Sequence, residues 1–412
     1  MTNPYPQKKN YVLKISMTHI HNSWKFFLKR SIYLRKRRNI WRNRFVIRQN
    51  DPTKITFNDK EYVSFSSNDY LGLSFNKDIK RSWKIGLDRY GNGSSSSGHI
   101  VGYSEEHELL ERRLSLWLGY EEALLFGSGY SANQSIVFSL MKRKDSIFAD
   151  KKSHASFVEA AAFSRSTFKR FVHNSADSLQ TLLQKFYGDK NLIFTEGIFS
   201  MDGNFSKLKM IHEVSQKYDS YLMVDDAHGI GVFGEGGRGS CDMFQIRPEI
   251  LMIGFGKAFG ICGSAILCSG DMKDYLLNYS KNLIYSTMMP ASQAFALLES
   301  LRQVKKSDHL RKKLRRNIEF FKEMTKRYKI PFLHELSKSG IQPIIVGNDQ
   351  KCIELSEFLF KRNIWTQAIF PPTVPFGTSR IRIVITACHD VVDIEKLVLS
   401  LKEFFDQNEY EQ

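Results

Sequence analysis

Cysteine is scarce in this chain of 412 residues, and long uninterrupted apolar runs are missing. The five cysteines are odd in number and never spaced as CxxC, which argues against a disulfide framework and excludes a zinc ribbon. The longest apolar stretch, residues 250–268, is broken by Lys257 and several glycines, so it does not have the pattern of a membrane span. We therefore expect a protein of a reducing compartment, the cytoplasm, with no membrane partner.

Acidic residues are absent from the first 50 positions, which hold thirteen Lys and Arg. The formal net charge is +17, so this segment carries +13 of it and leaves the rest of the chain near neutral. The run 35–38 (RKRR) lies among Trp and Phe residues and is typical of an amphipathic basic helix. A solvated helix face, a targeting peptide and base-composition drift are the alternatives, and no small-residue cleavage site supports targeting.

From residue 61 onward, short β-rich runs alternate with helical patterns. The expected strands are 122–126, 146–149, 191–195, 221–225 and 250–253, and the expected helices lie near 130–141, 155–164, 176–187 and 207–218. This alternation predicts a mostly parallel sheet covered on both faces, with functional groups at the carboxyl ends of its strands.

The pattern changes after about residue 300. We expect one long charged helix over 294–327, then 341–346, a helix, 364–368, 380–385 and a final helix to about Phe405. The expected parts are a basic arm with a segment joining the small lobe (1–64), a large α/β domain (65–300) and a small α+β domain (301–412).

Lys257 lies among glycines in 254–260 (GFGKAFG), directly after an apolar strand. Burial there would lower the pKa of its ammonium group, as a lysine that bonds to a carbonyl carbon requires. The glycines would let the backbone approach a bulky cofactor closely. Taken alone, the pattern fits a snorkelling surface lysine at least as well.

The strand 221–225 ends in an acid–x–x–His pattern that delivers Asp225 and His228 to one cleft. In a pyridoxal phosphate (PLP) site, the carboxylate would keep the pyridine nitrogen protonated and the imidazole would bond to the phenolic oxygen of the ring. A metal site is the alternative, but no nearby His or Asp cluster supplies a third ligand.

Two more segments follow strands. Residues 127–133 (GSGYSAN) offer free backbone N–H groups and a helix dipole to an anion such as a phosphate, without the Lys-Ser/Thr of a P-loop. His154, after Ser153, would be placed to stack on a ring, although a helix-capping Ser153 beside an incidental histidine explains the pattern equally well.

From about Arg42 to the C-terminus, the chain resembles the α-oxoamine synthases, a family of fold-type I PLP-dependent transferases. The motifs that carry the resemblance are 65–73 (FSSNDYLGL), 98–111 with His107, 127–133, 153–156 (SHAS), 196–203 (EGIFSMDG), 224–231 (VDDAHGIG), Lys257, 284–287 (IYST) and 371–375 (PPTVP) with Arg380 and Arg382. The resemblance implies an α/β fold with a mostly parallel central sheet, a smaller α+β C-terminal lobe and an N-terminal helical arm.

The resemblance also implies roles for matching residues. Lys257 would hold PLP covalently and move the α-proton of the substrate, Asp225 would pair with the pyridinium nitrogen, and His228 would contact the ring hydroxyl. The other residues that would contact PLP are His154, stacked on the ring, Ser200, Gly129 and Tyr130. Those that would contact the substrate are His154, Arg42, Thr373 and, through a carboxylate, Arg382.

Residues 341–343 (IQP) and the 371–375 group favour the branch of biotin biosynthesis that condenses L-alanine with a pimeloyl thioester of acyl carrier protein or coenzyme A. The resemblance implies a homodimer with both active sites at its interface. Two positions depart from the family pattern: Gly254 replaces a hydroxyl residue that contacts the phosphate, and Phe370 replaces a common arginine.

Two other interpretations remain open. The same machinery serves glycine C-acetyltransferases and 5-aminolevulinate synthases, which use glycine, and enzymes that join serine to a fatty acyl thioester. A function of another class would be nucleic-acid binding by the basic arm on a degenerate PLP scaffold, but the arm has no recognised nucleic-acid motif. We expect no metal and no nucleic-acid partner.

The basic arm could steer the thioester substrate to the enzyme. In that case, deleting residues 1–20 or raising the salt concentration should lower the kcat/KM for the thioester.

Overall fold

The computed structural model describes residues 24–37, 41–331 and 337–409. Its centre is a seven-stranded sheet in the order β4-β10-β9-β8-β7-β5-β6. The strands are β4 (Glu122–Phe126), β5 (Ser146–Asp150), β6 (Thr167–Phe171), β7 (Asn191–Glu196), β8 (Tyr221–Asp225), β9 (Ile250–Gly254) and β10 (Ser264–Cys268). Only β10 runs antiparallel to its neighbours. Every residue of β5, β7, β9 and β10 is buried, as expected for strands covered on both faces.

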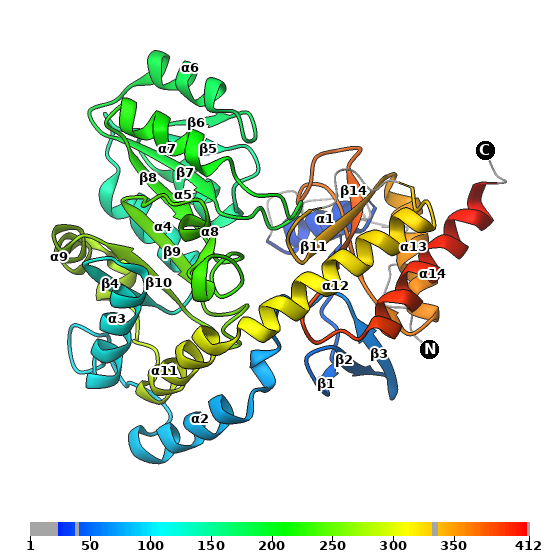
Figure 1. Ribbon diagram of the computed structural model, residues 1–412. Helices are drawn as coiled ribbons and strands as arrows, with labels where there is room; N and C mark the ends of the chain where they lie inside the picture. Colours follow the sequence, from blue (N-terminus) through cyan, green and yellow to red (C-terminus); the bar gives the residue numbers. More distant parts are fainter. Residues whose placement is uncertain (1–23, 38–40, 332–336, 410–412) are drawn as a thin grey trace.

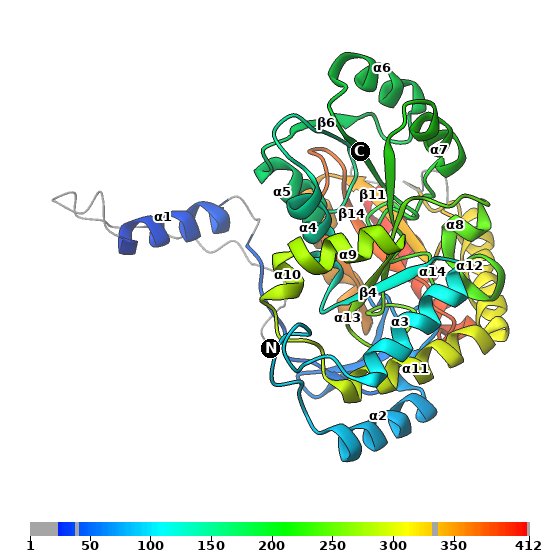
Figure 2. The ribbon, with the colours of Figure 1, turned by 90° about the vertical axis from the view of Figure 1, so that its left-hand side faces the viewer.

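Helices cover both faces of this sheet (Figures 1 and 2), and the buried apolar side chains of the two faces belong to two hydrophobic cores. Helices α4 (Gly129–Leu140), α5 (Ala155–Phe163) and α9 (Gly270–Tyr279) bury apolar side chains in one core. Helices α3 (Glu105–Leu118), α6 (Ala176–Phe186), α7 (Leu208–Lys217) and α11 (Ala291–Lys306) contribute to the other. Helix α2 (Lys77–Tyr90) packs along α11, and the short helices α8 (Gly239–Met243) and α10 (Lys281–Ile284) lie in connections.

The smaller lobe contains an antiparallel three-stranded sheet, β11-β14-β13, formed by β11 (Ile341–Gly347), β14 (Ser379–Val384) and β13 (Gln367–Ile369). Its helices are α12 (Asp308–Arg327), α13 (Asp349–Lys361) and α14 (Val391–Glu409). Strands β1 (Arg48–Gln49), β2 (Lys54–Phe57) and β3 (Lys60–Ser64) form another sheet with β12 (Ile364–Trp365). This pairing joins the N-terminal segment to the small lobe. The division of the chain at residues 65 and 300 stays a prediction.

The single helix expected over 294–327 is wrong, because α11 ends at Lys306 and α12 begins at Asp308. The Arg311 side chain donates to the carbonyl of Val304 at 2.8 Å, so it satisfies an acceptor in the last turn of α11 that a continuous helix would use itself. Strands β1, β2 and β3 were not predicted, and the run expected at 364–368 is divided between β12 and β13 of two sheets. In the central sheet, two strands were also missing from the prediction. Strand β6 has mostly polar, half-exposed residues, and β10 belongs to the interrupted apolar stretch after Lys257.

Helix α1 (Trp24–Arg37) is the helical part of the basic segment among the described residues, and it buries none of its side chains. It extends away from the rest of the molecule (Figure 2). No helix within the described ranges is long and apolar enough to span a membrane.

Candidate active site

The predicted cofactor residues come together at the carboxyl ends of the parallel strands. Asp225 ends β8, and its carbonyl accepts the backbone N–H of Gly197, which follows β7, at 2.8 Å. His154 follows β5 and caps α5. Lys257 lies in the connection from β9 to β10. Because these strands are neighbours in one sheet, side chains that are far apart in the sequence share one site.

A chain of hydrogen bonds links Asp225 to His154. The Asn133 amide nitrogen donates to Asp225 Oδ2 and to Ser156 Oγ, both at 2.9 Å, and Asp225 Oδ1 accepts the backbone N–H of Ala227 at 3.1 Å. Since Ser156 Oγ accepts from Asn133, its own proton is directed to His154 Nδ1, 2.8 Å away. Nδ1 is then an acceptor, and the hydrogen of the neutral imidazole lies on Nε2.

The pKa values agree with a neutral imidazole. Part of the His154 residue is exposed, but desolvation of its imidazole lowers its pKa; the carboxylate of Asp225 opposes this shift, and the charge of Lys257 adds to it. The Asn133–Ser156 chain therefore fixes both the orientation of Asp225 and the tautomer of His154. The sequence contains Asn133 and Ser156 in the quoted motifs, but we assigned no role to either.

His228 has a partner that sequence reasoning did not identify, Tyr70 of the 65–73 motif. The Tyr70 hydroxyl lies 2.7 Å from His228 Nδ1. Burial raises the pKa of Tyr70 to about 12. Burial, followed by the charges of Lys257 and Arg382, lowers the pKa of His228 well below its usual value. A neutral His228 that accepts from Tyr70 at Nδ1 carries its hydrogen on Nε2, where it is available to a ligand.

Lys257 is half-buried. Burial lowers the pKa of its ammonium group, while the nearby carboxyl groups of Asp225 and Glu196 oppose that shift. Among the described residues, it forms none of the salt bridges within 4.0 Å. A lysine in this state is available as a nucleophile and as a base.

Glu196 is a functional candidate that we did not single out from the sequence. It ends β7 directly beside Asp225 in the parallel register and is 3% exposed. Burial, followed by the charge of Asp225, raises its pKa well above the usual value, although backbone N–H groups of His154 and Ser200 counteract this. Its Oε1 atom is buried and has no hydrogen-bond partner within the described part of the chain. A protonated Glu196 avoids two adjacent negative charges.

The expected anion cradle is the N-terminus of α4. Ser128 caps this helix, its Oγ accepting the backbone N–H of Ser131 at 3.1 Å. Gly129 and Tyr130 form the first turn, where backbone N–H groups lack partners within the helix. A Cβ atom on Gly129 would lie 3.2 Å from Met252 Cε, so a side chain here would press on the Met252 side chain of β9.

Gly254, the first departure from the family pattern, has an ordinary backbone conformation rather than a left-handed one. A Cβ atom there would lie 3.0 Å from the Ala227 methyl group. A hydroxyl side chain at position 254 would therefore press on Ala227, which lies between Asp225 and His228 in the sequence.

We expect the double variant Gly254→Thr/Ala227→Gly to bind PLP about tenfold more tightly than the wild type, because the new hydroxyl adds a hydrogen bond to a charged group. Gly254→Thr alone should gain less, since its Cβ presses on Ala227. Equilibrium titration of the apoenzyme with PLP measures both, with Ala227→Gly as the control. Unchanged affinity in a folded double variant would show that other groups already compensate.

The predicted substrate residues form two contacts between distant parts of the chain. Arg42 donates from Nη2 to Thr373 Oγ1 at 3.1 Å. Arg382, on β14, donates from Nε to the carbonyl of Ser200 at 2.7 Å and from Nη2 to Asn68 Oδ1 at 3.0 Å. The structure thus connects Arg382 to Ser200 of the predicted cofactor pocket. Phe370, the second departure, packs against the main core.

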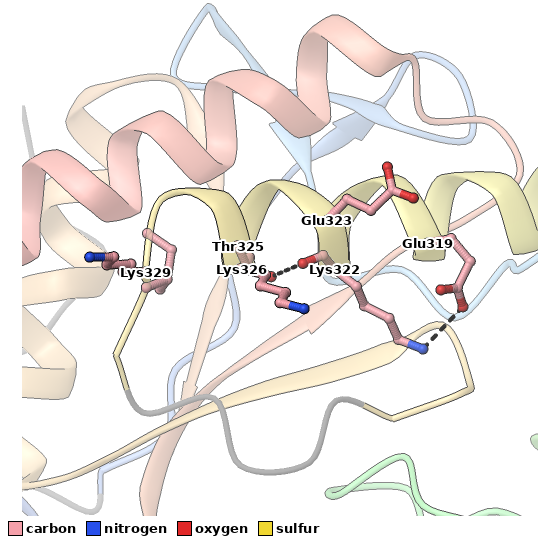
Figure 3. A pocket seen from close by; sticks show the side chains of 7 residues that line it. Glu319, Lys322, Glu323, Thr325, Lys326 and Lys329 are labelled. Atoms are coloured by element: carbon pink, nitrogen blue, oxygen red, sulfur yellow. Dashed lines mark hydrogen bonds and ion pairs between the residues drawn. The ribbon is translucent and has the colours of Figure 1, made fainter.

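A separate pocket of about 440 Å³ lies along the second half of α12 (Figure 3). Glu319 and Lys322, one turn apart on α12, form an ion pair of 3.1 Å in its lining. It contains none of the predicted site residues. Within the described ranges, no group of three His, Cys, Asp or Glu side chains is arranged to hold a metal ion.

Comparisons with known proteins agree with this geometry. The model of the aminotransferase class I and II family matches residues 60–401. The 8-amino-7-oxononanoate synthase of Photorhabdus laumondii is 48% identical over 381 residues, which cover 92% of this chain and 99% of that protein. The structure of the Francisella tularensis 8-amino-7-oxononanoate synthase has a TM-score of 0.73 at 29% identity and covers 85% of this chain and 99% of its own.

A serine palmitoyltransferase of S. paucimobilis with bound PLP has a TM-score of 0.86 and covers 93% of this chain and 98% of its own. It is 23% identical, so this similarity shows the fold.

Proposed function

The chain belongs to the aminotransferase class I and II family and, within it, to the 8-amino-7-oxononanoate synthases, and on this premise we propose that it condenses L-alanine with a pimeloyl thioester. A carbon–carbon bond forms between the α-carbon of alanine and the thioester carbonyl carbon, and the carbon–sulfur bond breaks to release a thiol. The alanine carboxylate leaves as carbon dioxide. The observation that carries the proposal is the meeting of Lys257, Asp225 and His228 at the carboxyl edge of one sheet.

These residues fit PLP, the cofactor of this family. Asp225, oriented by Asn133, would hold the pyridinium nitrogen, and Nε2 of His228 would donate to the ring hydroxyl. The N-terminus of α4 at Gly129 would hold the phosphate. The bound cofactor supplies an electron sink that stabilises negative charge on the substrate α-carbon.

Proton movement falls to Lys257. Its lowered pKa increases the fraction of neutral amine, which can take the α-proton of alanine and return a proton to the product carbon. We propose that Arg382 pairs with the substrate carboxylate. We further propose that Arg42 and Thr373, joined by their hydrogen bond, contact the substrate as a unit.

Mass spectrometry of the product tests the proposed function. The purified PLP-loaded enzyme is incubated with L-alanine and pimeloyl-CoA or pimeloyl acyl carrier protein, and we expect 8-amino-7-oxononanoate and one equivalent of carbon dioxide. Parallel reactions with glycine or L-serine, and with acetyl-, succinyl- or palmitoyl-CoA, cover the alternative substrates. Turnover of glycine or serine in preference to alanine would overturn the assignment while leaving the PLP chemistry intact.

We propose that the enzyme is a cytoplasmic homodimer. Exposed apolar side chains near the 98–111 and 284–287 motifs support a subunit interface: Ile100, Val101 and Tyr285 are 74%, 75% and 78% exposed. Desolvating such side chains favours association.

Residues 1–20, the proposed docking element for the thioester, lie outside the described residues. Helix α1 continues the same charge pattern without an acidic residue. Both candidate thioesters present negative charge, as coenzyme A phosphates or as an acidic carrier protein, so a basic arm would speed their encounter with the enzyme.

We expect replacement of Lys25, Lys29 and Arg30 by Gln to lower kcat/KM for the thioester about threefold to tenfold at low salt. Alanine binding and PLP content should not change. The difference should shrink as salt rises, because charges are screened within about 8–10 Å at physiological ionic strength. A control replaces Lys312, Arg315 and Arg316, exposed on α12. Equal kcat/KM values of the α1 variant and the wild type at low salt would show that the basic side chains of α1 are only a solvated helix face.

A further inference from the structure

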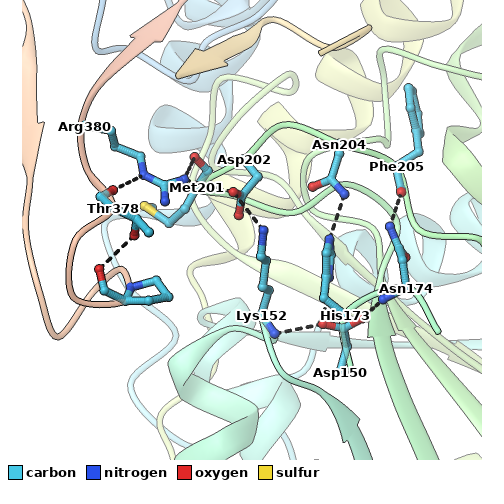
Figure 4. Close-up of polar contacts among 11 residues, drawn as sticks. Asp150, Lys152, His173, Asn174, Met201, Asp202, Asn204, Phe205, Thr378 and Arg380 are labelled. Atoms are coloured by element: carbon cyan, nitrogen blue, oxygen red, sulfur yellow. Dashed lines mark hydrogen bonds and ion pairs between the residues drawn. The ribbon is translucent and has the colours of Figure 1, made fainter. Parts of the chain in front are cut away.

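Asp202 joins cations from the two lobes. It lies in the connection between β7 and α7, and its Oδ1 atom accepts from Lys152 Nζ at 3.0 Å and from Arg380 Nη1 at 2.9 Å. Figure 4 shows Asp202 between these two side chains. Burial would raise the pKa of Asp202, but the hydrogen bonds and charges of Lys152 and Arg380 outweigh burial and hold it below the usual value. Asp202 is therefore an anion shared by two cations.

Each cation belongs to a segment that carries an active-site residue. Lys152 lies two positions before His154. Arg380 lies two positions before Arg382 on β14, so both arginines point to the same face of the sheet. The Asp202 carboxylate thus ties the His154 segment of the large lobe to the Arg382 strand of the small lobe.

The connection that presents Asp202 is itself held to the large lobe (Figure 4). The buried Asp150 carboxylate bonds to His173 Nδ1 at 2.9 Å, and His173 Nε2 lies 2.7 Å from the Asn204 side chain. Asn174 donates from Nδ2 to the carbonyl of Phe205 at 2.9 Å. These hydrogen bonds hold the residues that follow Asp202 against the large lobe. Asp202 is therefore anchored to that lobe rather than carried at the tip of a free loop.

Arg382 depends on the same connection, since its Nε atom donates to the carbonyl of Ser200, two residues before Asp202. Arg380 is 3% exposed. Without the Asp202 charge, its guanidinium would be left buried without a salt-bridge partner among the described residues. An unpaired buried charge is strongly unfavourable, so the strand would move to expose it and would carry Arg382 with it.

We propose that Asp202 is a positioning residue for the amino-acid substrate: through Arg380 and Lys152, it sets the separation between Arg382 and the cofactor residues of the large lobe. The proposal rests on the proposed function in that Arg382 binds the substrate carboxylate. Asp202 does not itself contact substrate or cofactor.

Asp202→Asn in the PLP-loaded holoenzyme tests this. It keeps the shape of the side chain and removes its charge. We expect the Kd for L-alanine, from titration of the cofactor absorbance, and the KM for L-alanine to rise about tenfold or more, since misplacement by about 1 Å is costly at such a site. PLP content and the KM for the thioester should stay within about twofold of the wild type. Arg380→Lys keeps a cation, so its Kd for L-alanine should lie between those of the wild type and Asp202→Asn.

Lys190→Met is the matched control, because it removes a 3.0 Å ion pair with Asp145 inside the large lobe. It should leave alanine binding unchanged. If Asp202→Asn does not fold, the Kd of Arg380→Lys carries the test. Wild-type Kd in every folded variant, or a loss of kcat without a change in Kd, would overturn the positioning role.

The Kd of each variant is divided by that of the wild type, and this ratio is measured with whichever of L-alanine, glycine or L-serine the wild type binds. A wrong substrate assignment therefore appears in the wild-type product assay, and a wrong role for Asp202 appears in the ratio.

Discussion

Replacing Lys257 with alanine should lower kcat by at least about a thousandfold, because we propose that this one side chain both binds the cofactor covalently and moves the proton. Burial lowers its pKa, so a larger fraction of its amine is neutral at a given pH than in an exposed lysine. Steady-state product formation measures the loss. Exchange of the α-proton of L-alanine in D₂O, followed by NMR, should fall in parallel, which assigns the defect to proton transfer.

The covalent attachment is tested separately by borohydride reduction of the holoenzyme and mapping of the pyridoxyl group by mass spectrometry. We expect the label on Lys257 in the wild type and its loss in the alanine variant. Lys151→Ala, which changes an exposed lysine after β5, should retain label and activity. A label on another lysine of the wild type would contradict the mechanism.

Strand periodicity and composition sufficed for five of the seven strands of the central sheet, because buried parallel strands form short, nearly continuous apolar runs. They failed for β6, where that signal is absent, and for β10, whose apolar run was taken as part of the interrupted stretch after Lys257. Strand β6 is partly exposed, and no local sequence signal distinguishes the break at Ser307 from a continuing helix. At that break, Arg311 reaches back from α12 to the carbonyl of Val304 in α11, a contact that the sequence pattern does not reveal.

The candidate site shows a similar limit. Residues with distinctive chemistry, such as Lys257 and Asp225, could be singled out from the end of each strand. Their supporting groups could not, because Tyr70 reaches His228 across 158 positions and Asn133 reaches Asp225 across 92. Glu196 could have been found, since an acid at the end of a strand with the apolar run 192–194 is unusual.

Asp225→Asn should lower kcat by at least about a hundredfold while the variant keeps PLP, because it removes a preorganised charge that stabilises the transition state. The asparagine has nearly the same shape, and its amide oxygen can still accept from Asn133 Nδ2, which now bonds to Asp225 at 2.9 Å. The amide NH2 then faces the Ala227 N–H, so one acceptor is lost. The larger loss is the negative charge that we propose keeps the pyridine nitrogen protonated, and with it the capacity of the ring to accept electrons. Exchange of the alanine α-proton should therefore slow as much as turnover.

Asp226→Asn is the matched control one residue away. The Asp226 carboxyl is fully buried and accepts the backbone N–H and the hydroxyl of Ser240 at 2.7 and 2.5 Å, and burial raises its pKa to about 7. Because its bonds belong to the 226–240 connection rather than to the cofactor, we expect this variant to change thermal stability and to leave proton exchange near the wild-type rate. Near-normal exchange in Asp225→Asn, with a large loss in Asp226→Asn, would instead place the pyridinium partner at Asp226.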